Sequence, residues 1–329
     1  MCCEPLEGQA LFKRVLLGEM ILNTGQRTDI IGFYSKWLLR RFEQGYVDVR
    51  NPYYPSLVTR YALDPKTVDC IGVCTKNPLP IMDHLDVFKA FPGVHWSVTI
   101  TPYGKDLEPY VPDKKRGVEC LIRLSKEFGV DAAFWRYDPI IVNERYTVEQ
   151  HFRSFEVICG LLQGFVKTVV VSFLDIFPKV KQNYPEAKPV SIEDKHVLVK
   201  GLVEIAAKYG IRVRMCHEGE EWEQYGADCR GCLLKEDYEK VIGKKLRIPS
   251  SMKGARQGCN CILSGDIGAY SSCPHLCRYC YANSDKDQVL DNFKKHDPES
   301  SFLIGGPRPD DVLRIAKQVS WIEDTITLF

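Results

Sequence analysis

The run Val166-Lys-Thr-Val-Val-Val-Ser172 is the most β-branched stretch of the chain and decides its fold class. β-branched residues favour strands, and a continuous apolar run is typical of a strand buried on both faces of a parallel sheet. A helix is predicted on each side of it, because Thr147 and Ser191 are candidate N-caps and Gly210 is a typical helix end. We therefore expect the strand and helix alternation of an α/β protein.

The same alternation repeats outward from this strand. Five more apolar runs are predicted as strands, at residues 20–24, 68–74, 94–100, 130–135 and 211–215. Six strands alternating with helices predict a parallel sheet, and right-handed crossovers close it toward a partial or full TIM-type (β/α) barrel. The pattern stops near Gly219. We expect an N-terminal extension (1–19), a barrel (20–218) and a cysteine-rich, cluster-binding C-terminal region (219–329).

The composition favours a cytoplasmic protein. A formal charge of +1 gives no global electrostatic reason to expect a nucleic-acid partner. No apolar run reaches membrane-spanning length, and the opening Met1-Cys-Cys-Glu-Pro5 lacks the basic segment of a secretory signal. In the cytoplasm, the 14 cysteines are expected to bind metal more often than to form disulfides.

The stretch Cys273-Pro-His-Leu-Cys277-Arg-Tyr-Cys280 contains the main candidate metal site. Three cysteines at this spacing can converge on one 4Fe-4S cluster, and they leave one iron without a protein ligand. An open coordination position is typical of a metal site that carries out chemistry. The alternative is a zinc site, in which His275 or another nearby cysteine completes a tetrahedron.

Further cysteines predict a second metal site in the C-terminal region. Five thiols precede the triplet, and four of them would complete either a closed 4Fe-4S cluster or a tetrahedral zinc site. These are Cys216, Cys229, Cys232, Cys259 and Cys261. A second 4Fe-4S cluster is the interpretation we prefer to zinc.

Polar side chains follow the predicted strands, where the loops of an α/β barrel bind ligands. Arg27, Asp29, Arg136 and Asp138 are the candidate catalytic residues, since an arginine there could hold a substrate carboxylate. Lys76, Asn77 and Thr101 are candidate cofactor-binding residues. Asp29 and Asp138 have an alternative interpretation as helix caps. We expect the triplet to cap the barrel mouth, with the four candidate catalytic side chains in the cavity beneath it.

The triplet, with Tyr279 before its third cysteine, resembles the Cys-x3-Cys-x2-Cys signature of radical S-adenosylmethionine (SAM) enzymes. The resemblance implies that the open iron chelates SAM and that Tyr279, with Tyr281 beside it, lies near the cofactor. It also implies a small-molecule substrate and a one-electron reductant such as ferredoxin or flavodoxin. The alternative class is an iron-sulfur electron carrier or a zinc-stabilised binding module without SAM chemistry.

The chain also resembles the uncharacterised DUF1848 family. The matching pieces include Gln26-Arg-Thr-Asp29, Trp135-Arg-Tyr-Asp-Pro139, Cys259-Asn-Cys261 and Tyr279-Cys-Tyr-Ala-Asn283. In that family's pattern the cysteine six residues after a Tyr-Gly pair corresponds to Cys232, which implies that Cys229 is the spare thiol. Radical SAM enzymes carry their triplet after the first barrel strand, whereas here it follows the sixth, so an altered SAM pose could release an aminocarboxypropyl radical instead of a 5′-deoxyadenosyl radical.

Overall fold

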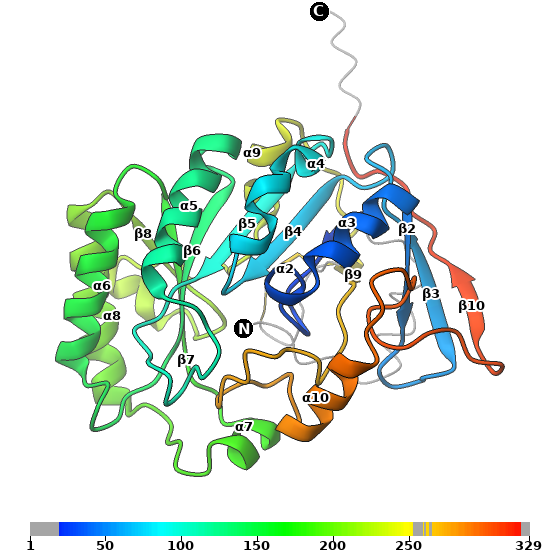
Figure 1. Ribbon diagram of the computed structural model, residues 1–329. Helices are drawn as coiled ribbons and strands as arrows, with labels where there is room; N and C mark the ends of the chain where they lie inside the picture. The colour runs from blue at the N-terminus through cyan, green and yellow to red at the C-terminus, as the bar shows by residue number, and fades with distance from the viewer. Residues whose placement is uncertain (1–19, 253–258, 260, 263–264, 324–329) are drawn as a thin grey trace, which may run out of the picture.

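Seven parallel strands form the main sheet of the protein, in the order β8-β7-β6-β5-β4-β1-β9 (Figure 1). The computed structural model describes residues 20–252, 259, 261–262 and 265–323. All six predicted strands are confirmed, and β9 is an additional strand that pairs with β1. The strands are β1 (Ile21–Asn23), β4 (Cys70–Thr75), β5 (Val94–Thr99), β6 (Ala133–Ile140), β7 (Thr168–Phe173), β8 (Arg212–Met215) and β9 (Gly265–Asp266).

The sheet confirms the predicted α/β class, but the observed strand pairing does not show a closed barrel. Among the described residues, the edge strands β8 and β9 do not pair with each other. A parallel bridge between Arg214 and Asp228 continues the sheet one step past β8. Six strands were predicted instead of seven because the two residues of β9 are too short to give a hydrophobic run.

Helices cover one face of the sheet and bury its outward side chains (Figure 1). Trp135 of β6 stacks on Phe155 of α6, with 4.8 Å between the ring centroids. The predicted N-caps are confirmed, since Thr147 and Ser191 accept hydrogen bonds from the third backbone amide beyond them. The helices are α2 (Ile30–Phe33), α3 (Ser35–Gln44), α4 (Leu85–Lys89), α5 (Lys114–Phe128), α6 (Val148–Leu162), α7 (Pro178–Asn183), α8 (Ile192–Lys208), α9 (Lys235–Ile242) and α10 (Lys286–Lys294), with 3-10 turns η1 (Leu79–His84), η2 (Glu221–Tyr225) and η3 (Ser250–Met252).

A second sheet of three strands was not predicted (Figure 1). It consists of β2 (Tyr46–Arg50), β3 (Leu57–Ala62) and β10 (Val312–Ile315). β2 and β3 form an antiparallel pair, and β10 adds to β3 in parallel from the far end of the sequence. Such long-range pairing leaves no local sequence pattern.

The C-terminal region packs onto the main sheet. Tyr238 of α9 lies in one buried cluster with Ile21 of β1, Cys70 of β4 and Trp321. The predicted boundary near Gly219 therefore does not separate two hydrophobic cores. The predicted extension, residues 1–19, lies outside the described part of the chain. No helix in the described part is long and apolar enough to cross a membrane.

Candidate functional site

The three cysteines of the triplet line one cavity at the carboxyl ends of β1, β4 and β5. We call it the thiol cavity; it encloses about 90 Å³. The walls include five other residues singled out from the sequence: Arg27, Asp29, Lys76, Tyr279 and Tyr281. This is the end of the sheet at which the sequence analysis expected the triplet to lie.

The triplet loop is held by hydrogen bonds from its own flanks and from α2. The side chain of Asn283 accepts from the amide of Cys273 at 3.4 Å and donates to the Cys273 carbonyl at 2.9 Å. The hydroxyl of Tyr34 donates to the carbonyl of Ser272. The amide of Ala282 donates to Sγ of Cys280 at 3.3 Å, the kind of hydrogen bond that tunes iron-sulfur clusters.

Glu108 is the main site residue that the sequence analysis missed. Its buried carboxylate accepts hydrogen bonds from Thr101 at 2.7 Å and from the hydroxyl of Tyr279, and it pairs with the ammonium groups of Lys76 and Lys114. Burial by itself raises the pKa of Glu108, but the two lysines and the Tyr279 hydroxyl outweigh it and lower the pKa to about 2. The network fixes Tyr279, Lys76 and Thr101 as one unit.

Asp29 connects the loop after β1 to the triplet loop. Its Oδ1 caps α2 by accepting from the amide of Gly32 at 2.8 Å, which is the alternative role considered for it. Its Oδ2 accepts from the amide of Lys76 and lies 2.9 Å from Nε2 of His275. Burial raises the pKa of Asp29, but the hydrogen bond and charge of His275 bring it below its ordinary value.

Both ring nitrogens of His275 face other groups, which argues against His275 as the fourth ligand of a zinc site. Its Nδ1 lies 3.3 Å from the carbonyl oxygen of Tyr110, and its Nε2 faces Asp29. Neither ring nitrogen is therefore directed at the thiols as a fourth ligand.

Arg136 and Asp138 lie inside β6 and not beyond its end, because the strand runs on to Ile140. They point to the same side of the strand and form a buried ion pair, with Nη2 of Arg136 2.6 Å from Oδ2 of Asp138. Arg136 lines a smaller inner cavity of about 40 Å³, which shares Gln26 and Tyr281 with the thiol cavity. The prediction that Arg136 and Asp138 lie in the loop after the strand is therefore wrong, and their catalytic roles stay predictions.

The remaining candidate cofactor residues have well-defined positions. Tyr279 is buried between Glu108 and the ring of Tyr103. Tyr281 donates its hydroxyl hydrogen to the carbonyl of Gln26 and lines both the thiol cavity and the inner cavity. Thr101 and Asn77 are not among the residues that line the thiol cavity, and the amide of Asn77 donates to the hydroxyl of Thr75.

The donor set of the triplet fits a 4Fe-4S cluster, which takes thiolate ligands. Among the described side chains, no three His, Cys, Asp or Glu surround one point closely enough to hold a metal ion. A 4Fe-4S cluster does not need this convergence, since each thiolate bonds a different iron. Burial raises the pKa of Cys277 and Cys280, and the positive charge of Lys76 opposes that effect at both thiols.

The four cysteines predicted as a second site are neighbours in the structure. Cys216, Cys232, Cys259 and Cys261 pack in one buried cluster with Phe134 and Val170. Sγ of Cys232 lies 3.3 Å from Sγ of Cys261. Cys229, the predicted spare, packs elsewhere, against the main core. The assignment of Cys216 as a metal ligand stays a prediction.

A comparison with family models finds one that covers most of the chain. The model described as Domain of unknown function (DUF1848) matches residues 21–282, which include both cysteine groups. No curated protein matches the chain.

Proposed function

Because the chain belongs to the DUF1848 family, whose function is unknown, we propose an activity from the site itself: a radical SAM-type enzyme acting on a small molecule. The observation that carries the proposal is that Cys273, Cys277 and Cys280, three thiols of one loop, line one cavity with a cation, Lys76, beside them. Cys74 of β4 lines the same cavity from outside that loop. This set supplies three thiolates to a cluster that needs four ligands.

The residues of the chain would hold a 4Fe-4S cluster and position its partner. Cys273, Cys277 and Cys280 would bind three of the irons, and Asn283 and Ala282 would fix the loop by the hydrogen bonds described above. When bound, the cluster supplies one electron to the sulfonium of SAM, whose broken carbon–sulfur bond leaves a carbon radical. Arg27 and Tyr281 line the thiol cavity on the side from which a substrate would approach.

Partners follow from this chemistry. Each SAM cleavage uses one electron from an external donor, and ferredoxin or flavodoxin is suited to supply it.

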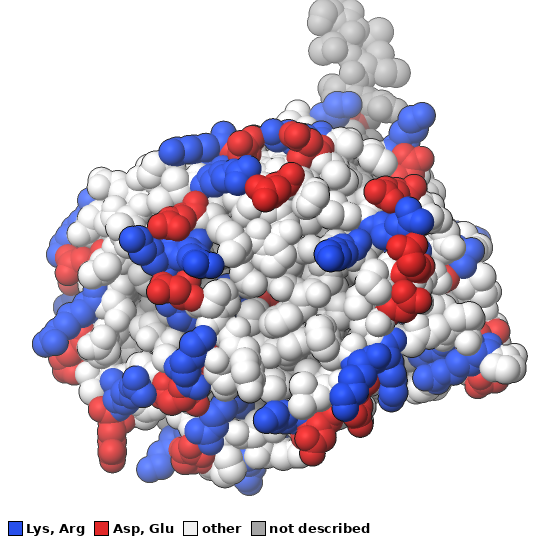
Figure 2. Space-filling view, viewed as in Figure 1, with Lys and Arg blue, Asp and Glu red and all other residues white. Residues whose placement is uncertain are grey.

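Figure 2 shows acidic and basic side chains interspersed on the face it presents, without a continuous basic patch. Together with the net charge of +1, this supports a small-molecule substrate over nucleic acid.

The test is anaerobic purification followed by iron analysis and reduction in the presence of SAM. We expect a brown protein with about four irons on the triplet. Replacing Cys273, Cys277 and Cys280 by Ala should remove those irons and abolish SAM cleavage, whereas Cys120→Ala on α5 should leave both unchanged. The product identifies the broken bond: 5′-deoxyadenosine indicates a 5′-deoxyadenosyl radical, and methylthioadenosine indicates an aminocarboxypropyl radical.

Other outcomes support the alternative class. A brown protein that is reduced but leaves SAM intact would be an electron carrier. A colourless protein with stoichiometric zinc would be a zinc-stabilised binding module, and either result overturns the proposal.

A further inference from the structure

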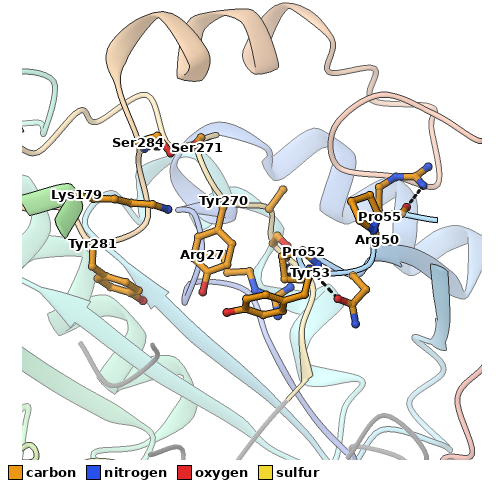
Figure 3. A pocket seen from close by; sticks show the side chains of 13 residues that line it. Arg27, Arg50, Pro52, Tyr53, Pro55, Lys179, Tyr270, Ser271, Tyr281 and Ser284 are labelled. Atoms are coloured by element: carbon orange, nitrogen blue, oxygen red, sulfur yellow. Dashed lines mark hydrogen bonds between the residues drawn. The ribbon is translucent and has the colours of Figure 1, made fainter. Parts of the chain in front are cut away.

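A second, larger cavity adjoins the thiol cavity and shares Arg27 and Tyr281 with it. We call it the outer cavity; it encloses about 520 Å³. That volume is within the range of about 300–1,000 Å³ typical of small-molecule sites. Its walls come from the loop after β1, the end of β2, α7 and the segment before the triplet (Figure 3).

All the charged residues that line the outer cavity are cations: Arg27, Arg50 and Lys179. Arg50 forms a bidentate ion pair with Asp311, in which Nη2 of Arg50 lies 2.9 Å from Oδ2 of Asp311. Nε of Arg27 lies 3.8 Å from Oδ1 of Asp266, and Nη1 of Arg27 donates to the carbonyl of Gly268 at 3.5 Å. The carboxylate oxygens of Asp266 also accept hydrogen bonds from the amides of Gln26 and Gly268, so its negative charge is shared between these amides and Arg27.

Arg27 and Lys179 converge on one aromatic ring. The guanidinium carbon of Arg27 lies 5.5 Å from the ring centroid of Tyr270, and Nζ of Lys179 lies 4.7 Å from the same centroid. Figure 3 shows Lys179 reaching from α7 toward Tyr270, with Tyr53 and Tyr281 nearby. An anion bound between these two side chains would pair with both positive charges.

From this arrangement we infer that the outer cavity binds a small organic anion, a carboxylate or a phosphate monoester with a flat apolar body. Arg27 and Lys179 would hold the anionic group through charge-assisted hydrogen bonds. Tyr53, Tyr270 and Tyr281 would contact the body, because aromatic side chains supply large flat apolar surfaces. That this anion is the substrate rests on the proposed function; that the cavity binds it does not.

Isothermal titration of the anaerobically purified protein with three ring compounds tests the inference. The probes are benzoate, phenyl phosphate and the neutral benzamide. We expect benzoate or phenyl phosphate to bind and benzamide to bind at least about ten-fold more weakly, since it lacks the charge. The stronger of the two anions identifies the class as carboxylate or phosphate. Binding of neither, or equal binding of benzamide, overturns the inference.

Variants localise the binding. Lys179→Gln and Arg27→Gln should each weaken the anion about ten-fold. The matched control is Lys181→Gln, which removes the same charge from an exposed position on α7. An equal loss in the Lys181→Gln protein would mean diffuse electrostatics and would overturn the site. Circular dichroism melting of each variant separates loss of binding from loss of folding.

Three further results keep this inference separate from the proposed function. If SAM displaces the bound anion, the outer cavity is the SAM site and the assignment to a substrate is wrong. If neither anion binds while iron is retained and SAM is cleaved, this inference alone fails. If an anion binds at Arg27 and Lys179 but SAM is never cleaved, the enzymatic proposal alone fails.

Discussion

The hydroxyl of Tyr279 donates a hydrogen bond to the buried carboxylate of Glu108, 171 residues earlier in the chain. Tyr279 lies between two of the triplet cysteines, and Glu108 lies in the loop after β5. The same carboxylate pairs with Lys76 after β4 and with Lys114 at the start of α5. Glu108 therefore anchors the triplet loop to the carboxyl ends of two strands.

Replacing Glu108 by Gln should destabilise the fold. The substitution leaves Lys76, whose side chain is 12% exposed, without a counter-charge. Removing one partner of a buried ion pair costs about 3–5 kcal/mol. We expect the free energy of unfolding, measured with urea, to fall by this amount, whereas Glu119→Gln, at an exposed position of α5, should change it by less than about 0.5 kcal/mol. A loss no larger than that of the control would contradict the anchoring role.

Acid should destabilise the wild-type protein through the same residue. The pKa of Glu108 is about 2 in the folded protein, against an ordinary value of 4.5. Because the folded-state pKa is lowered, its contribution is fully present above pH 4.5 and is lost as the pH falls toward 2. The loss is on the order of 3 kcal/mol. Urea unfolding at a series of acidic pH values should show a smaller decline for Glu108→Gln than for the wild type, and parallel curves would refute this assignment.

The sequence predicted the main sheet because each strand leaves a local pattern. The β-branched run at 166–172 became β7 (Thr168–Phe173). β10 left no such pattern, because its pairing with β3 joins residues more than 250 positions apart. Sequence proximity cannot reveal that partner.

The site shows the same limit. The three cysteines of the triplet line one cavity, and their convergence on one cluster stays a prediction. Glu108 could not be recognised, because a single acid in a loop has no distinguishing pattern until Lys76 and Tyr279 are brought to it by the fold. Arg136 and Asp138 were found in the sequence but misplaced, since the strand predicted to end at residue 135 continues to Ile140.

The position of Asp138 inside β6 gives a stability prediction. Asp138→Asn leaves the buried guanidinium of Arg136 without its paired carboxylate, which should cost about 3–5 kcal/mol. The control is Asp131→Asn, next to the start of the same strand, where the carboxylate pairs with a largely exposed lysine and contributes less than about 1 kcal/mol. Urea unfolding measures both. If Asp138→Asn is as stable as the control but loses SAM cleavage, the pair acts in catalysis and not in the fold.

The packing of Cys232 against Cys261 leads to a prediction about the second cysteine group. These thiols lie in the buried cluster that joins the C-terminal region to β6 and β7. If they bind a metal, its binding energy is part of the folding energy of that region. Replacing both by Ala should therefore remove a metal that the triplet variant retains, and should lower the melting temperature.

Cys229 provides the matched control for this experiment. It belongs to the same stretch of chain but packs against the main core, so Cys229→Ala should keep the full metal content. Iron and zinc are counted in both variants and in the triplet variant, with the protein purified under reducing conditions. Loss of iron identifies a second cluster, and loss of zinc identifies a structural zinc site. If the Cys232 and Cys261 double variant keeps the same metals as Cys229→Ala, these cysteines are buried thiols that stabilise the fold by packing alone.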